Sequence, residues 1–161
     1  MMSLSTKLSR LIVKSQIRSA KFASLFCCLL LLLLGTIHSI FMTIYAKQIS
    51  KILISDAASA KYIEKNIKIL ALFVPLICLQ GGVFGTLRAI DGQKAFLGAQ
   101  LVCNYGVHFG SMGVFLWGMG MDSAAMWWAR LCSLSCLNVV GVVVIWRTDW
   151  EEKGRVIKRS M

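Results

Sequence analysis

The sequence predicts an all-α integral membrane protein, a helical bundle with four transmembrane helices. Apolar residues make up 57% of its 161 residues and charged residues only 16%, whereas a soluble domain is about a quarter charged. A single proline leaves long helices unbroken almost everywhere. Uncharged runs long enough to cross a bilayer recur along the chain, without the alternating pattern of strands. These observations exclude soluble and disordered architectures.

Four apolar runs define the predicted spans. They cover residues 22–46, 69–87, 95–121 and 123–146. Each is close to, or longer than, the roughly 20 residues that a helix needs to cross the hydrocarbon core. The first run is too long for the apolar part of a signal peptide, so we expect a retained helix. Asp122 and Ser123 predict an N-cap for the fourth helix after a tight hairpin.

The segments that flank the transmembrane region 22–146 carry most of the positive charge. In the leader, residues 1–21, apolar side chains recur at helical spacing opposite lysines, which fits a basic amphipathic helix on an anionic leaflet or an unstructured leader. The tail, residues 147–161, is also charged. Leader, second connector and tail together hold twelve Lys and Arg, against five in the first connector. Because positive residues favour the cytoplasm, we predict that both termini are cytoplasmic.

Composition also excludes several functions. The net charge of +11 does not indicate nucleic acid, since the cations lie at the edges of apolar runs, where a bilayer places them. The six cysteines lie inside apolar runs without a Cys-x-x-Cys pair, so we expect buried hydrophobes rather than metal ligands. Phosphate-loop, zinc and hydrolase motifs are absent from the sequence, and no predicted span holds a carboxylate. We therefore expect no enzyme, cofactor or metal site, and the lipid bilayer as the first partner.

Polar side chains inside the spans are the candidate functional residues, because such groups are costly in lipid. Gln100, Asn104 and His108 are spaced by four, which places them on one face of an α-helix, with Tyr105 beside them. Gln80 and Thr86 of the second span join the set. Two interpretations remain open: a substrate path lined by these side chains, or hydrogen bonds between helices, which contribute about 0.6 kcal/mol each on average.

The second and third spans also contain residues that affect how helices bend and pack. Pro75 removes a backbone hydrogen bond and predicts a kink in the second span. The pairs Gly81 with Gly85 and Gly106 with Gly110 have the spacing that permits close helix approach.

Two kinds of residue mark the predicted membrane boundaries. Arg130, two turns into the fourth span, is expected to extend toward the interface or to pair with another chain. Tryptophans flank the spans as an aromatic belt would. Trp117, Trp127 and Trp128 lie at one boundary, and Trp146 and Trp150 at the other.

Two segments resemble a known signature. The first consists of Leu79–Gln80–Gly81, then Gly85–Thr86–Leu87–Arg88, then Gly92–Gln93–Lys94. The second is the tail segment Arg147–Thr148–Asp149–Trp150–Glu151. The first is similar to the signature of the multidrug and toxic compound extrusion (MATE) family, and the second to the segment that closes the last core helix of its eukaryotic members. Spacing between the two segments also matches, with two helices between them.

The resemblance implies a fold and an activity. Family members have twelve helices in two lobes, and these four spans resemble the last four, a part of the second lobe. Members exchange organic cations or drugs for protons or sodium. In this reading Gly85 and Gly92 shape a tight turn that Arg88 ties to neighbouring carbonyls.

The sequence also departs from the family pattern. Ile77 replaces a common acidic residue, and Ala89 the last glycine of the Leu-Arg-Gly motif. We therefore expect a truncated chain that does not transport alone and that needs the missing helices or a partner membrane protein. A small four-span structural or regulatory membrane protein is the alternative.

Overall fold

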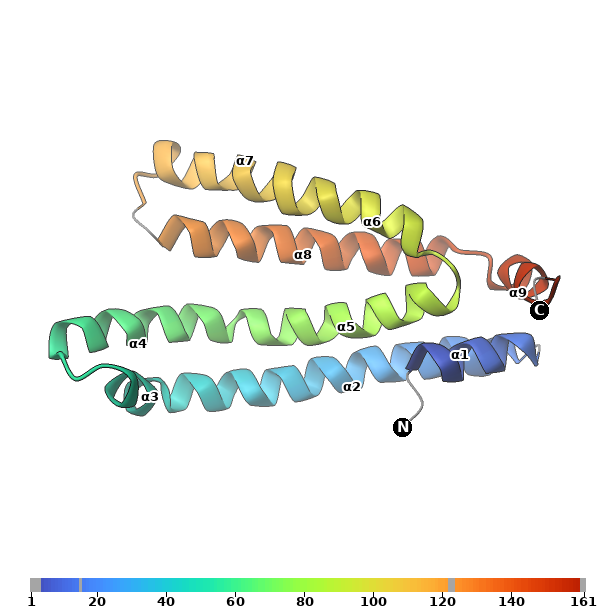
Figure 1. The fold of residues 1–161 in the computed structure, drawn as a ribbon, viewed down its shortest axis with the longest axis horizontal. Coiled ribbons are helices and arrows are strands. Elements are labelled where there is room, and N and C mark those ends of the chain that lie inside the picture. The colour runs from blue at the N-terminus through green and yellow to red at the C-terminus, as the bar shows by residue number, and fades with distance from the viewer. Residues whose placement is uncertain (1–3, 15, 122–123, 160–161) are drawn as a thin grey trace.

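All regular elements are helical in the computed structural model, which describes residues 4–14, 16–121 and 124–159 (Figure 1). In chain order they are α1 (Leu4–Val13), α2 (Ile17–Ile44), α3 (Ala46–Leu53), α4 (Ala57–Ala71), α5 (Phe73–Ala89), α6 (Gln93–Leu101), the π-helix η1 (Val102–Val107), α7 (His108–Gly113), the π-helix η2 (Val114–Gly118), α8 (Ala124–Arg147) and α9 (Trp150–Arg159). The predicted cap at Asp122 and Ser123 lies outside the described residues.

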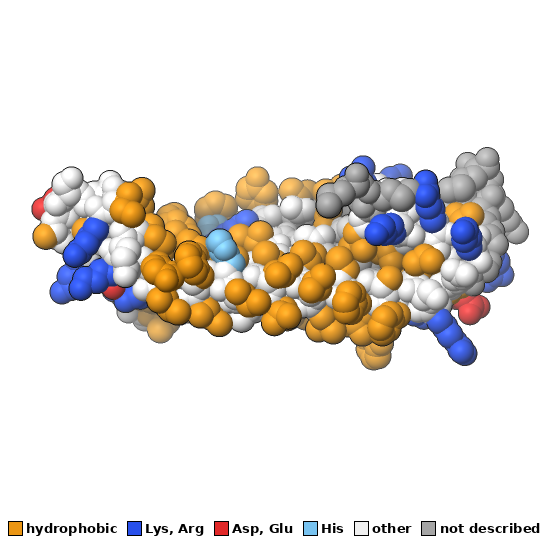
Figure 2. All heavy atoms as spheres, turned by 90° about the horizontal axis from the view of Figure 1, so that it is seen from below, with side chains coloured by type: hydrophobic (Ala, Val, Ile, Leu, Met, Phe, Trp, Pro, Cys, Tyr) orange, Lys and Arg blue, Asp and Glu red, His pale blue; other side chains and the backbone are white. Residues whose placement is uncertain are grey.

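Three helical stretches within the described chain are long and apolar enough to cross a membrane. They are Ile17–Ile44, Ala57–Ala89 and Ala124–Arg147, and they contain the first, second and fourth predicted spans almost completely. The third predicted span falls on residues 93–118, where α and π segments alternate. Figure 2 shows hydrophobic side chains over the middle of one face, with Lys and Arg gathered at the two ends. This distribution is that of an integral membrane protein.

The long helices lie side by side in a row (Figure 1). Helix α5 packs between α2 and α8, and α8 in turn packs against α6, η1 and α7. Helix α3 folds back on α4 at one end of the row. Helices α1 and α9 lie toward the opposite end, where they contact each other.

The second predicted span is interrupted shortly before Pro75, where the sequence predicts a kink. Helix α4 ends at Ala71 and α5 begins at Phe73, with Leu72 between them. Pro75 therefore lies in the first turn of α5, where a missing N–H disturbs the helix least. Beyond this turn α5 continues without a break to Ala89.

The most fully buried side chains gather at the end that holds the termini. Leu8 and Ile12 of the leader helix α1 are buried there, together with Leu87, Phe96 and Trp150. The apolar face of α1 thus packs against protein, while its lysines lie on the exposed side. In contrast, only 6% of the residues in the most apolar 18-residue segment of α2 are buried. The helices are therefore tightly packed at the end that holds α1 and α9, whereas most side chains of α2 are left exposed along the length of the row.

Glycines allow the closest helix contacts. A Cβ atom built on Gly35 of α2 would lie 2.7 Å from Cα of Pro75, and one on Gly82 would lie 3.0 Å from Sγ of Cys28. On α8, a Cβ at Gly141 would lie 2.4 Å from Cγ1 of Val83. These three glycines set the spacing of α5 from its two neighbours.

The glycine pairs predicted from spacing do not have this role. No atom lies within 4 Å of a Cβ built on Gly81 or Gly110, and Gly106 meets only Val102 of its own segment. Gly85 does lie close to another element, but that element is the leader, through Leu4 at 3.2 Å. The prediction is therefore wrong for three of the four positions, because the spacing alone does not tell which face meets a neighbour.

Candidate functional site

Three of the four polar residues predicted together on the third span line a shallow groove. Gln100, Asn104 and Tyr105 meet there over a volume of about 500 Å³. Leu97, Leu101 and Phe109 complete the lining. The rings of Tyr105 and Phe109 stack with their centroids 6.3 Å apart. The groove therefore combines an amide and a phenol with apolar walls, a composition suited to an amphiphilic ligand.

His108 does not join the groove, because η1 changes the helical period. In an α-helix residues four apart lie about one turn apart, but a π-helix closes its hydrogen bonds after five residues. Four residues therefore fall short of a turn in η1, and His108 does not line the groove with Asn104. Its ring lies 5.3 Å from that of Phe109, and its Nδ1 atom is buried without a hydrogen-bond partner in the described chain.

Arg130 reaches the groove from the neighbouring helix. Its Nη1 atom donates a hydrogen bond to Oδ1 of Asn104 at 2.6 Å. A hydrogen bond from a charged donor is roughly twice as strong as a neutral one. Arg130 thus bonds Asn104 within this chain, and it places a positive charge beside the amide oxygen of Asn104.

Thr86 and Gln80 lie elsewhere. Thr86 is buried, and its hydroxyl shares a hydrogen bond of 2.8 Å with Ser24 of α2 while donating to the Gly82 carbonyl at 3.0 Å. Thr86 thus forms a hydrogen bond between helices, which is one of the two roles predicted for polar residues in the spans. Gln80 is half-buried on α5 and does not line the groove.

Two residues that the sequence reasoning missed tie α8 to its neighbours. Asn138 donates to the carbonyls of Leu76 at 3.1 Å and Leu134 at 3.0 Å. Ser133 donates to the carbonyl of Cys103, at the start of η1, at 2.7 Å. The sequence did contain a signal for both residues, because an uncharged polar side chain within an apolar run is costly in lipid unless it forms a hydrogen bond.

The motif at the end of α5 forms a helix-ending turn. The amide of Gly92 donates to the carbonyl of Leu87 at 2.8 Å, the long hydrogen bond of a Schellman motif. Asp91, with φ at 53°, takes the left-handed position that glycine commonly fills. The predicted tight turn is thus present, although Gly92 itself has φ at −91°.

The other motif residues surround this turn. Leu87 is fully buried, Gln93 is half-buried, and Arg88 and Lys94 are exposed. No hydrogen bond joins Arg88 to a carbonyl within the described residues, so its expected role as a tie is not what the structure shows. Arg88 instead lines a depression with Ser5, Thr6 and Ser9 of α1.

The tail motif starts α9. Oδ1 of Asp149 accepts hydrogen bonds from the amides of Glu151 at 2.9 Å and Glu152 at 3.2 Å. Both hydrogen bonds lower the pKa of the Asp149 carboxyl below its usual value, and the bond from the Glu152 amide contributes most. Asp149 is therefore an N-cap, and its charge also suits the positive end of a helix.

Trp150 follows the cap into the core. It is 3% exposed, and its Nε1 atom donates to the carbonyl of Ile145 at 3.2 Å. The predicted place of Trp150 in an aromatic belt is wrong, because the turn at residues 148–149 directs the ring inward. Trp146, which is 85% exposed, does occupy a surface position.

The comparison with known families agrees with the motif. Residues 1–114 match the MatE family, a stretch that runs from α1 to the first residue of η2 and includes the motif of α5 and α6. No curated protein matches the chain. The match covers more than half of the 161 residues. Since this family consists of membrane transporters, the comparison agrees with the apolar helices and with the expectation of a non-enzyme. The chain belongs to the MatE family.

Proposed function

We propose that this chain contributes four membrane-crossing helices to a MATE-type antiporter, with both termini in the cytoplasm. The family match over residues 1–114 carries the proposal. The stretch 93–118 supports a fourth crossing, because it runs the length of α8 beside it (Figure 1). Helices α1 and α9 lie on the same side of the row and contact each other, which is consistent with an even number of crossings. The excess of Lys and Arg at that end supports its cytoplasmic orientation.

Cysteine labelling tests this topology. Ala58 and Lys94 are exposed and lie at opposite ends of the α4–α5 stretch. In a cysteine-free background, a membrane-impermeant maleimide applied outside intact cells is expected to label Ala58→Cys and not Lys94→Cys. Permeabilised cells serve as the control, in which both positions must react. Labelling of Lys94→Cys alone from outside would reverse the orientation.

The groove of Gln100, Asn104 and Tyr105 is the candidate substrate path. MATE transporters move organic cations, and a cation in a low-dielectric site needs a nearby carboxylate or a similar anionic group. The groove instead lies beside the guanidinium of Arg130, and its lining includes no carboxylate. We infer that the groove gains its anionic groups from further helices, so that this chain alone does not exchange cations.

Alternating access leads to the same inference. Carriers with repeated lobes work by rocking one bundle against another around a central site. A row of helices in which α5 and α8 are the inner members provides a single rigid unit. We propose that exchange of an organic cation for protons or sodium arises when this unit faces a second one.

A transport assay tests the inference. Purified protein in liposomes, with an imposed pH or sodium gradient, is expected to show no gradient-dependent uptake of a fluorescent organic cation above that of empty liposomes. Uptake that Asn104→Leu abolishes would overturn the inference and make the chain a minimal transporter. Uptake that appears only with a second membrane protein carrying the remaining helices would identify an assembled transporter.

A further inference from the structure

The hairpin of α3 and α4 forms a surface of its own, at the end of the row opposite the termini (Figure 1). Helix α3 buries Ala46 and Ser50 against α4. Near the end of α3, Ile52 is 84% and Leu53 64% exposed. In water, the apolar surface of these two side chains would stay exposed to solvent after folding. At the end of an apolar span, the interfacial region of a bilayer covers such residues.

A basic cavity lies between the same two helices. Its volume is about 540 Å³, and Lys47 and Lys51 of α3 face it together with Lys61 of α4. The rest of the lining consists of Ser50, Ile54, Ser55, Ala57, Ala60 and Glu64. Three lysines from two helices thus border one space. We call these residues, Lys47, Lys51 and Lys61, the lysine cleft.

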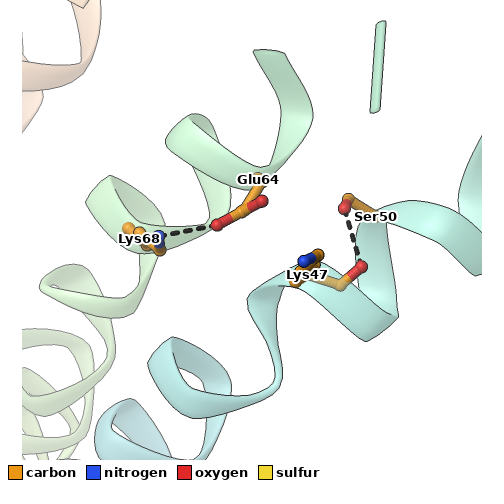
Figure 3. A network of polar contacts seen from close by, with 4 residues as sticks. All are labelled: Lys47, Ser50, Glu64 and Lys68. Atoms are coloured by element: carbon orange, nitrogen blue, oxygen red, sulfur yellow. Dashed lines mark hydrogen bonds and ion pairs between the residues drawn. The ribbon is translucent and has the colours of Figure 1, made fainter. Parts of the chain in front are cut away.

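The carboxylate in this lining already has a partner. Oε1 of Glu64 accepts a hydrogen bond from Nζ of Lys68, one turn along α4, at 2.7 Å (Figure 3). The Ser50 hydroxyl donates to the carbonyl of Lys47 at 3.0 Å. Asp56, at the start of α4, accepts from the amide of Ser59 at 2.8 Å. The nearby negative groups are therefore engaged, and the lysine cleft keeps an excess of positive charge.

We propose that the lysine cleft binds the phosphate of an anionic phospholipid of the surrounding bilayer. Ammonium groups are compact point charges that bind phosphate oxygens without the planar fit that arginine requires. Clusters of lysines beside an apolar span attract anionic headgroups for the same reason, and in the topology proposed above the lipid belongs to the leaflet opposite the cytoplasm. The exposed Ile52 and Leu53 then lie among the acyl chains below that headgroup. A soluble anion would contact the lysines but leave these two side chains uncovered. This proposal is independent of transport.

Lipid retention in native mass spectrometry tests the proposal. The full chain in neutral detergent is titrated with phosphatidylglycerol or with phosphatidylcholine, which carries the same phosphate with no net charge. One phosphatidylglycerol is expected to bind more tightly than phosphatidylcholine. The variant Lys51→Gln with Lys61→Gln is expected to weaken phosphatidylglycerol binding about tenfold or more.

The matched control removes two charges elsewhere. Lys65 lies on α4 outside the lining and Lys14 at the other end of the molecule, and both are exposed. Lys14→Gln with Lys65→Gln is expected to leave the affinity within about twofold. Circular dichroism confirms that both double variants remain helical. A second variant, Glu64→Gln, is expected to tighten binding, because it removes the carboxylate and releases Lys68.

Three outcomes would overturn the proposal. Equal binding of the two lipids would remove the role of charge, and equal losses in the two double variants would show a diffuse electrostatic effect. Displacement of the lipid by millimolar glycerol phosphate would identify a soluble anion as the ligand instead. If the lysine variant lost its helices, the direction of the Glu64→Gln effect would decide, with weaker binding contradicting the proposal.

Discussion

A single methyl group at Gly35 is expected to lower the thermal stability and the yield of folded protein sharply. In Gly35→Ala the new Cβ would lie 2.7 Å from Cα of Pro75 and 3.0 Å from Cβ of Cys78. Neither atom belongs to the far end of a flexible side chain, so α2 and α5 must move apart along their interface. Overpacking that forces such backbone shifts costs about 1–3 kcal/mol, and occasionally more.

Gly110→Ala provides the matched control. No atom lies within 4 Å of a Cβ built there, and Gly110 is also helical. Alanine is favoured over glycine inside a helix by about 1 kcal/mol, so this variant is expected to be as stable as the parent or slightly more so. Fluorescence-detected gel filtration after heating measures both proteins in detergent. Equal melting temperatures for the two variants would mean that α2 and α5 are farther apart at Pro75 than described.

The second large effect is expected at Trp150. Trp150→Ala removes a side chain that is 3% exposed and packed in the core at the terminal end, a change that costs about 3–5 kcal/mol in a core. Its indole also donates to the Ile145 carbonyl. Trp146→Ala is the control, because its ring is 85% exposed. Thermal unfolding should separate the two variants clearly.

A third variant divides the effect at Trp150 into its parts. Trp150→Phe keeps an aromatic ring in the core and loses the indole N–H, so it is expected to lie between the parent and Trp150→Ala. An unsatisfied Ile145 carbonyl costs about 1–3 kcal/mol. Similar stability for Trp150→Ala and Trp146→Ala would contradict the inward position of Trp150.

The long helices could be predicted from the sequence because lipid imposes a simple rule on it. A charge at the bilayer centre is costly, so an uncharged run has edges that can be located to within a few residues. The predicted run 123–146, whose only internal charge is Arg130, agrees closely with the observed helix Ala124–Arg147 for this reason. A disturbance near Pro75 was also predictable, since proline lacks an N–H, but the position of the break at Leu72 was not.

The site was harder to predict, because side-chain directions depend on the helical period and on neighbours. A spacing of four placed His108 with Asn104 only on the assumption of an α-helix, and the π-helix η1 removed that assumption. Arg130 appeared isolated in the sequence, yet it bonds Asn104 from the facing helix. Such pairs depend on which helices are adjacent, and periodicity carries no information about that.

The contact between α1 and α9 joins two helices that are far apart in the sequence. Gly154 lies so close to the leader that a Cβ there would be 3.3 Å from Cγ2 of Ile12. Leu8 and Ile12 pack against α5, but the core that they share also contains Trp150 of α9. Contacts of such long sequence separation form slowly. The core around the leader is therefore completed only after α8 has brought α9 back to it.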